Sequence, residues 1–158
     1  MSLKIRRVVT GHDEQGRAKV LIDENVSNVI SGRPGAQSSV IWSSIGFPVN
    51  NDGDNDPSHE EIATTIDNGT VFRIVSYGPG VAPRNHRTDS LDYAVVIFGE
   101  IDMDLDIGSV HLKAGDVVVQ RGTIHNWVNK GSVPCVIAFT LIASKSVTAG
   151  GKALPARG

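Results

Sequence analysis

The segment GPGVAPRNHRTDSLDYAVVIFG, residues 78–99, decides the fold class of this chain. His86, Thr88 and Asp92 are separated by even numbers of residues. Residues at even spacing on a strand share one face, so His86 and Thr88 point to the same side. Asp92 has the same parity and can reach that side after a turn. The segment therefore predicts a polar cluster on the inner face of a β-structure.

Most of the remaining chain shows the period-two alternation that is typical of strands. In EIDMDLDIG, residues 100–108, the apolar side chains Ile101, Met103, Leu105 and Ile107 should face a core and the acidic ones solvent. Further strands are predicted over residues 18–21, 39–43, 70–77, 92–98, 116–120 and 133–142. The last two are apolar on both faces and should be covered on both sides. Residues 58–66 are predicted to form a short helix or a loop. Many short strands with glycine-rich turns indicate an all-β sandwich or barrel.

Length and composition indicate one globular domain. The chain has 158 residues, of which 40% are hydrophobic, and its formal charge is −2. We expect an N-terminal arm over residues 1–15, a barrel domain over 16–144 and a flexible C-terminal tail over 145–158. The charge gives no basic patch for nucleic acid, and no apolar run approaches the roughly 20 residues of a membrane span. The single cysteine, Cys135, lies in an apolar run and excludes an intrachain disulfide, so we expect a cytoplasmic protein with an inert core thiol.

Two further patterns carry a resemblance to a known family. The first consists of Gly80, His86, Thr88, Asp92 and Gly99, and the second of Gly115, Gly122, His125 and Asn129. Together they resemble the paired motifs of the cupin superfamily. The strings VVTGHD, HRTDSLDY and GDVVVQRGT resemble a subgroup of small cupins from bacteria and fungal biosynthetic clusters. The resemblance implies an all-β cupin double-stranded β-helix, a jelly-roll barrel, with N-terminal extension strands. It also implies a homodimer in which strands such as 18–21 pack across a twofold axis.

The resemblance implies a divalent metal ion (Zn, Fe, Mn or Ni) on His86, Asp92 and His125, because two imidazoles and a carboxylate form a common ligand set. Two substitutions alter that set. Thr88 stands where the family has a second histidine, and Asp92 stands where it has glutamate. Aspartate is shorter by about 1.3–1.5 Å, so Asp92 must move inward, act through water or accept a hydrogen bond from an imidazole. The alternative is a hydrogen-bonded polar network without a metal.

Three functions remain open from the sequence. The first is an enzyme that acts on an organic acid or an aromatic, polyketide-like molecule as a decarboxylase, cyclase, isomerase or dioxygenase, with His86, Asp92 and His125 as catalytic residues. Thr88, Arg121 and Trp127 would then bind substrate, although a turn arginine is commonly solvated and a strand tryptophan commonly packs in a core. The second is a non-catalytic barrel that binds a small ligand. The third is a structural or regulatory dimer, and fold alone cannot separate the three.

Overall fold

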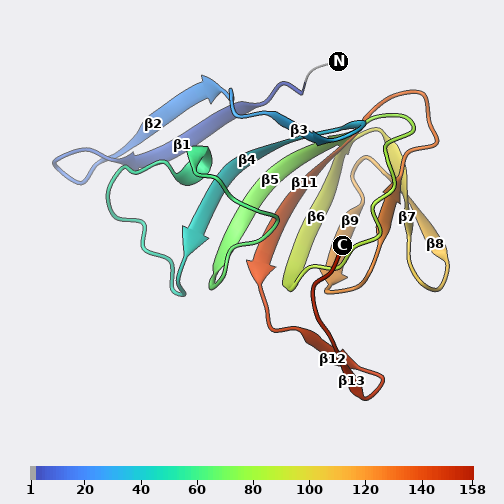
Figure 1. Ribbon diagram of the computed structural model, residues 1–158. Coiled ribbons are helices and arrows are strands. Elements are labelled where there is room, and N and C mark those ends of the chain that lie inside the picture. Colours follow the sequence, from blue (N-terminus) through green and yellow to red (C-terminus); the bar gives the residue numbers. More distant parts are fainter. Residues whose placement is uncertain (1–2) are drawn as a thin grey trace.

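The computed structural model describes residues 3–158, and most of this chain forms a barrel of two antiparallel sheets (Figure 1). The larger sheet has the order β3-β4-β5-β11-β6-β9 and the smaller one the order β10-β7-β8. The large sheet consists of β3 (Ile30–Arg33), β4 (Ala36–Ile45), β5 (Gly69–Tyr77), β11 (Cys135–Ala143), β6 (Ser90–Phe98) and β9 (Val117–Arg121). The small sheet consists of β10 (Asn126–Val128), β7 (Glu100–Asp104) and β8 (Ser109–Lys113). The all-β jelly-roll prediction is confirmed.

Both sheets contribute alternate residues to one core. In β5 the buried side chains include Val71, Val75 and Tyr77, and β7 contributes Ile101 and Met103. The strand β11 lies between β5 and β6, and its buried residues are Cys135, Ile137, Phe139 and Leu141. This period of two is what a strand requires when only one of its faces meets the core.

The chain crosses from the large sheet to the small one at Gly99, between β6 and β7. Its φ of 75° lies in the left-handed region, and a Cβ here would stand 2.4 Å from the Pro134 carbonyl oxygen. Only glycine meets both conditions without strain. The position of Gly99 therefore fixes how β6, which carries Asp92, turns into the facing sheet.

Two strand predictions need correction. The strand expected over residues 100–108 ends at Asp104, because Leu105 N–H donates to the Gly108 carbonyl and closes a turn. Leu105 and Ile107 consequently leave the core, and Ile107 is 93% exposed. The second error concerns the strands β11 and β9, which we expected to be covered on both faces. The outer face of β11, from Val136 to Ile142, is only half-buried. In β9, Val117 and Val119 are 73% and 60% exposed, because no part of the described chain packs on that face.

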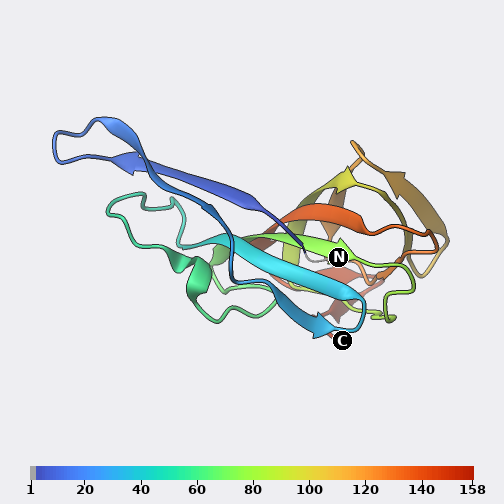
Figure 2. The same ribbon diagram turned by 90° about the horizontal axis from the view of Figure 1, so that it is seen from above.

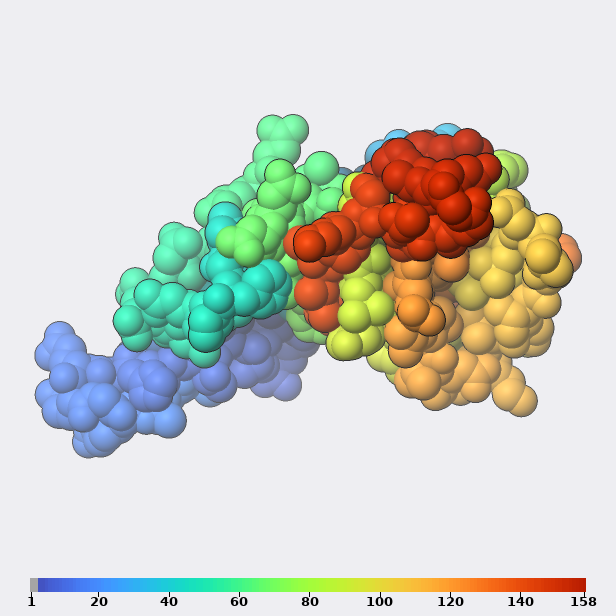
Figure 3. All heavy atoms as spheres, turned by 90° about the horizontal axis from the view of Figure 1, so that it is seen from below, coloured from blue at the N-terminus to red at the C-terminus, as the bar shows by residue number. Residues whose placement is uncertain are grey.

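The N-terminal segment forms a separate hairpin that extends away from the barrel (Figures 2 and 3). It consists of β1 (Arg6–His12) and β2 (Ala18–Asn25), which pair only with each other among the described residues. The hairpin continues to Asn25, so the arm boundary that we expected at residue 15 falls inside its turn. A short 3₁₀ turn, η1 (Pro57–His59), is the only helical piece of the predicted 58–66 region in the described chain, and a loop follows it.

The C-terminal segment is held by the rest of the same chain, contrary to the expected flexible tail. It forms a hairpin of β12 (Val147–Ala149) and β13 (Lys152–Leu154). The Asp89 carboxylate accepts hydrogen bonds from the Ser146 hydroxyl at 3.0 Å and from the Ala156 amide at 3.1 Å. Arg87 and Arg157 exchange backbone hydrogen bonds at 2.9 and 3.0 Å.

Across residues 3–158, no helix has the length and apolar character that a membrane span requires.

Candidate functional site

A cavity of about 510 Å³ lies inside the barrel. Of the residues singled out from the sequence, it is lined by His86, Thr88, Asp92, His125 and Trp127. Arg121 is the exception, because it is exposed at the end of β9 and does not line the cavity. The sequence therefore identified much of the polar wall, and Arg121 follows the alternative of a solvated turn arginine.

His86 and His125 come together through their backbones. His86 precedes β6 and His125 precedes β10, and each residue's N–H donates to the other's carbonyl oxygen at 3.0 Å. This isolated antiparallel bridge places the ring centroids 4.4 Å apart, and both side chains are buried. Residues that are 39 positions apart in the sequence thus form one pair of imidazoles.

The hydrogen bonds of the two rings determine which nitrogen faces the cavity. His86 Nδ1 lies 3.0 Å from the Arg84 carbonyl oxygen, and His125 Nδ1 lies 2.9 Å from the Thr123 carbonyl oxygen. Because a carbonyl oxygen can only accept, each contact assigns the proton to Nδ1 and leaves a lone pair on Nε2. Burial lowers the pKa of His86 to about 4 and also lowers the pKa of His125. Both rings are therefore neutral at pH 7 and can accept a proton or bind a metal ion through Nε2.

Asp92 belongs to a short chain of hydrogen bonds along the start of β6. Ser90 Oγ donates to Asp92 Oδ1 at 2.5 Å and lies 2.8 Å from Thr88 Oγ1. Burial raises the pKa of Asp92 to about 6, although the Ser90 hydrogen bond and the Arg73 charge act in the opposite direction. Thr88, which replaces a family histidine, thus supports the serine that holds Asp92.

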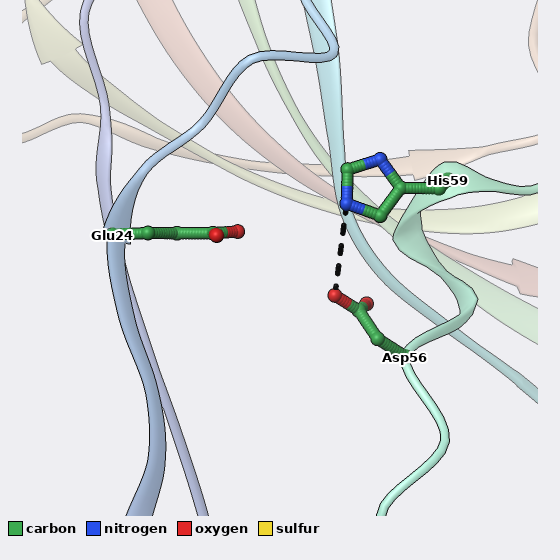
Figure 4. Close-up of side chains that lie close together, drawn as sticks. All are labelled: Glu24, Asp56 and His59. Carbon is green, nitrogen blue, oxygen red and sulfur yellow. Dashed lines mark ion pairs between the residues drawn. The ribbon is translucent and has the colours of Figure 1, made fainter.

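The two imidazoles fit a divalent ion, whereas Asp92 does not fit as their direct third ligand. Among the described residues, the one group of three His, Cys, Asp or Glu side chains whose ligand atoms lie within 4.8 Å of one another is elsewhere, at Glu24, Asp56 and His59 (Figure 4). Asp92 is instead held by Ser90, so action through water and a hydrogen-bonded network without a metal both stay open.

The Glu24, Asp56 and His59 group is better described as an ion-pair cluster than as a metal site. The buried Arg7 guanidinium lies among these side chains, with Nη2 2.5 Å from Glu24 Oε1 and 2.6 Å from Asp56 Oδ2. Its Nη1 also donates to Asp56 Oδ1 at 2.9 Å. A cation would have to displace this guanidinium, because the carboxylate oxygens already bind it.

Trp127 is both a core residue and part of the cavity wall. Its ring lies 5.9 Å from Tyr77, 5.7 Å from His125 and 5.9 Å from Phe139, measured between centroids. It is only 2% exposed. The two alternatives considered for this tryptophan, substrate contact and core packing, are thus compatible with one position.

Sequence reasoning missed three arginines that line the same cavity, Arg33, Arg73 and Arg84. Arg73 carried a usable signal, since it shares parity with the buried Val71 and Val75 and interrupts an otherwise apolar strand face. Arg33 and Arg84 lie at the end of β3 and in the segment before β6, where no periodicity marks them.

The fold and the buried histidine pair define a double-stranded β-helix of the cupin type. No protein-family model matches the chain. It is 35% identical to the cupin-domain-containing oxidoreductase fogC of Aspergillus ruber, over 94% of this chain and 77% of the relative. It is 34% identical to the cupin-domain-containing oxidoreductase virC of Hypocrea virens, over 89% of this chain and 77% of the relative. The chain belongs to the cupin superfamily and is a small cupin.

A solved structure agrees with this fold. An RmlC-like cupin from Shewanella frigidimarina superimposes with a TM-score of 0.50 and 14% identity, covering 74% of this chain and 84% of that one. At this identity the likeness concerns the fold alone.

Proposed function

We propose that this small cupin is an enzyme that binds a small organic molecule in its barrel and acts on it through His86 and His125, with Asp92 as a nearby acid or base. The observation that carries the proposal is the pair of buried, neutral imidazoles whose Nε2 lone pairs are free at a cavity of about 510 Å³. That volume lies in the ordinary range for small-molecule sites. The printed names of the relatives, which include oxidoreductases and a phomopsin biosynthesis cluster protein, support small-molecule metabolism.

A divalent ion (Zn, Fe, Mn or Ni) is part of this proposal, with His86 and His125 as the residues that would hold it. When bound, such an ion would supply a Lewis acid for polarising a carbonyl or enol oxygen of the substrate. The chain's own residues prepare for it, because the Arg84 and Thr123 carbonyls fix both rings in the tautomer that a metal requires. Asp92 stays tied to Ser90 and is available for proton transfer to a substrate atom.

A non-catalytic ligand-binding barrel is the second candidate, and one observation favours it. Thr88 replaces the family's second histidine and supports the Ser90 that holds Asp92. That arrangement satisfies the buried carboxylate without a metal. In this case the cavity would bind the same molecules without turnover.

The test is a metal titration of chelator-treated protein, with Zn²⁺ and Mn²⁺ alone as probes, followed by calorimetry and elemental analysis. We expect one ion per chain in the wild type and its loss in both His86→Gln and His125→Gln. Glu24→Gln is the matched control, because it alters the other cluster of possible ligands and should leave the stoichiometry unchanged.

Two results would contradict the metal part of the proposal. The first is substoichiometric metal in the wild type under all conditions. The second is an ion that Glu24→Gln removes and His125→Gln retains, since this would place it in the Arg7 cluster. If Asp92→Asn binds the small molecule as tightly as the wild type but no longer converts it, the result would favour the enzyme over the non-catalytic barrel.

We also propose that the chain forms a homodimer, as expected from the sequence, but through the outer face of β6 and β9 rather than through the strand over residues 18–21. The outer face of β6 and β9 exposes Tyr93, Ile97, Val117 and Val119, which leaves an apolar sheet surface uncovered. Burying such a surface against a second copy would stabilise the association. Sedimentation velocity at micromolar concentration should give the mass of two chains, and a single-chain mass would refute the dimer.

A further inference from the structure

The charges around the barrel cavity are strongly unbalanced. Its lining contains three arginines, Arg33, Arg73 and Arg84, and a single acidic residue among the described chain, Asp92. Burial raises the pKa of Asp92 to about 6, so at pH 7 this carboxylate remains largely ionised and offsets only one of the three positive charges. Arg33 and Arg73 form no ion pair with an Asp or Glu side chain among residues 3–158, whereas Arg84 Nη2 donates to the Gly158 oxygen at 2.9 Å. The cavity lining therefore carries an excess of positive charge, and Arg33 and Arg73 have no directly paired carboxylate among the described residues.

Arg73 enters the cavity from the middle of the large sheet. It lies in β5 opposite Phe139 of β11 and has the parity of the buried Val75. Its Nη2 donates to the Ala63 carbonyl at 2.5 Å, which holds the guanidinium in place. Its Nε is buried and has no hydrogen-bond partner in the part of the chain that the structure describes.

Arg33 approaches from the edge strand β3. Its Nε donates to the Ala82 carbonyl at 2.7 Å, and its guanidinium carbon lies 5.9 Å from the centre of the Tyr77 ring. Its Nη2 is also buried without an acceptor among residues 3–158. Each of the two guanidinium groups is thus anchored by one nitrogen and keeps a buried N–H donor unpaired.

Such an arrangement is costly unless something negative completes it. A buried charge without a partner loses its hydration, and an unpaired buried donor loses a hydrogen bond as well. Burial and the charge of Arg84 both lower the pKa of Arg33 and of Arg73, yet arginine remains protonated in proteins. An anion in the cavity would offset the two positive charges, since a guanidinium binds a carboxylate through paired N–H donors.

We propose that the substrate of this barrel is an organic carboxylate, with Arg33 and Arg73 as the residues that bind its carboxylate group. The apolar part of the molecule then packs against Tyr77, Trp127 and Phe139, which line the same cavity. This inference rests on the proposed function, because it names the chemical class of the molecule that His86 and His125 act on. It selects organic acids over the neutral aromatic molecules that the sequence left open.

The experiment compares benzoate with benzamide, which has nearly the same shape and no charge, by isothermal titration calorimetry on the chelator-treated full chain. Inorganic phosphate is the third probe and tests an anion without an apolar body. We expect benzoate to bind about 10- to 100-fold more tightly than benzamide, which is the range for a charge-assisted contact. We expect phosphate to bind more weakly than benzoate, because it leaves the aromatic wall uncovered.

Variants assign the preference to the two arginines. Arg33→Gln and Arg73→Gln should each weaken benzoate binding by about tenfold or more and leave benzamide unchanged. Arg17→Gln is the matched control, since it removes one positive charge from an exposed arginine in the β1–β2 hairpin. Because Arg73 also holds the Ala63 carbonyl, Arg73→Lys keeps the charge if Arg73→Gln misfolds, and Arg33→Gln tests the site from another strand.

The outcomes separate this inference from the function on which it rests. Equal affinity for benzoate and benzamide, or no benzoate binding at millimolar concentration, would overturn the carboxylate site even if His86→Gln and His125→Gln abolish metal binding. An equal loss of benzoate affinity in Arg17→Gln would also overturn it. Conversely, a benzoate preference that requires Arg33 and Arg73 supports the inference even when metal titration shows that the imidazoles bind no ion.

Discussion

Replacing Arg7 by methionine should detach the N-terminal hairpin from the barrel and lower the free energy of unfolding. Arg7 donates to the Ile41 carbonyl at 3.1 Å, to Glu24, and to both oxygens of Asp56. It thereby links β1 and β2 to β4 and to the loop that precedes η1. Methionine keeps the apolar stem but leaves these acceptors without their donor.

The size of the effect follows from the exposure of the partners. Removing one member of a fully buried ion pair costs roughly 3–5 kcal/mol. Here Arg7 is 3% exposed, but the Asp56 and Glu24 side chains are 20% and 41% exposed and can recover part of their hydration. We therefore expect a loss of about 2–3 kcal/mol, measured by urea unfolding at pH 7.

Arg6→Met is the matched control, because Arg6 forms an ion pair with Asp23 on the exposed side of the same hairpin. Two exposed charges contribute little, so this variant should unfold close to the wild type. The reasoning is refuted if Arg6→Met and Arg7→Met are equally destabilised.

Measuring the free energy of unfolding over a pH series tests the same contact between Arg7 and Asp56. The pKa of Asp56 determines the direction in which the stability should change. The Arg7 guanidinium holds the pKa of Asp56 well below its usual range. A lowered pKa in the folded state contributes stability that is complete above the unfolded pKa, near 3.9, and is lost as the pH falls. The difference between wild type and Arg7→Met should therefore narrow below about pH 4, and a difference that is constant from pH 7 to pH 2.5 contradicts the assignment.

Three further predictions concern other parts of the fold. Trp127→Ala should cost about 3–5 kcal/mol in urea unfolding, because it removes a buried ring that contacts Tyr77 and Phe139; a loss below 1 kcal/mol would mean that the wall packs loosely. Asp89→Asn should weaken the contacts of Ser146 and Ala156 and speed tryptic cleavage of the C-terminal hairpin while leaving the barrel's melting temperature unchanged; an unchanged cleavage rate would speak against that anchor. Asp102 and Glu100 raise the pKa of His111, so its contribution to stability is complete below the unfolded pKa and is lost as the pH rises through the folded one. His111→Gln should therefore be more destabilising at pH 5.5 than at pH 9, and the reverse order would contradict these ion pairs.

The β-structure could be predicted from sequence wherever one face of a strand is buried and the other is wet. The predicted strands over residues 70–77 and 92–98 correspond to β5 and β6, since their alternation reports the burial that the barrel imposes. The alternation of apolar and polar residues gave a wrong prediction at Ile107. The alternation continues from Leu105 to Gly108, but these residues form a turn that a backbone hydrogen bond closes. It also could not show that the outer side of β9 lacks a cover within the described chain, since burial depends on neighbours far along the sequence or on a second copy.

Residue parity along the strand and the spacing of the two motifs predicted only part of the candidate site. His86, Thr88 and Asp92 share an inner face, and the second motif adds His125 from a distant strand. The sequence could not fix the distance between Asp92 and the imidazoles, because this depends on how Ser90 and Thr88 hold the carboxylate. Arg33 reaches the cavity from an edge strand, so only the three-dimensional arrangement reveals it.

The most direct test of the account is the protonation state of the two imidazoles, read by long-range ¹H–¹⁵N NMR on chelator-treated, ¹⁵N-histidine-labelled protein at pH 7. Signals are assigned with His86→Gln and His125→Gln. The account predicts that both rings are neutral, with the proton on Nδ1 and an unprotonated Nε2, as their carbonyl contacts require. A proton on Nε2 of either ring, or an imidazolium at this pH, would contradict it, because the cavity would then lack the lone pair that binds an ion or accepts a proton.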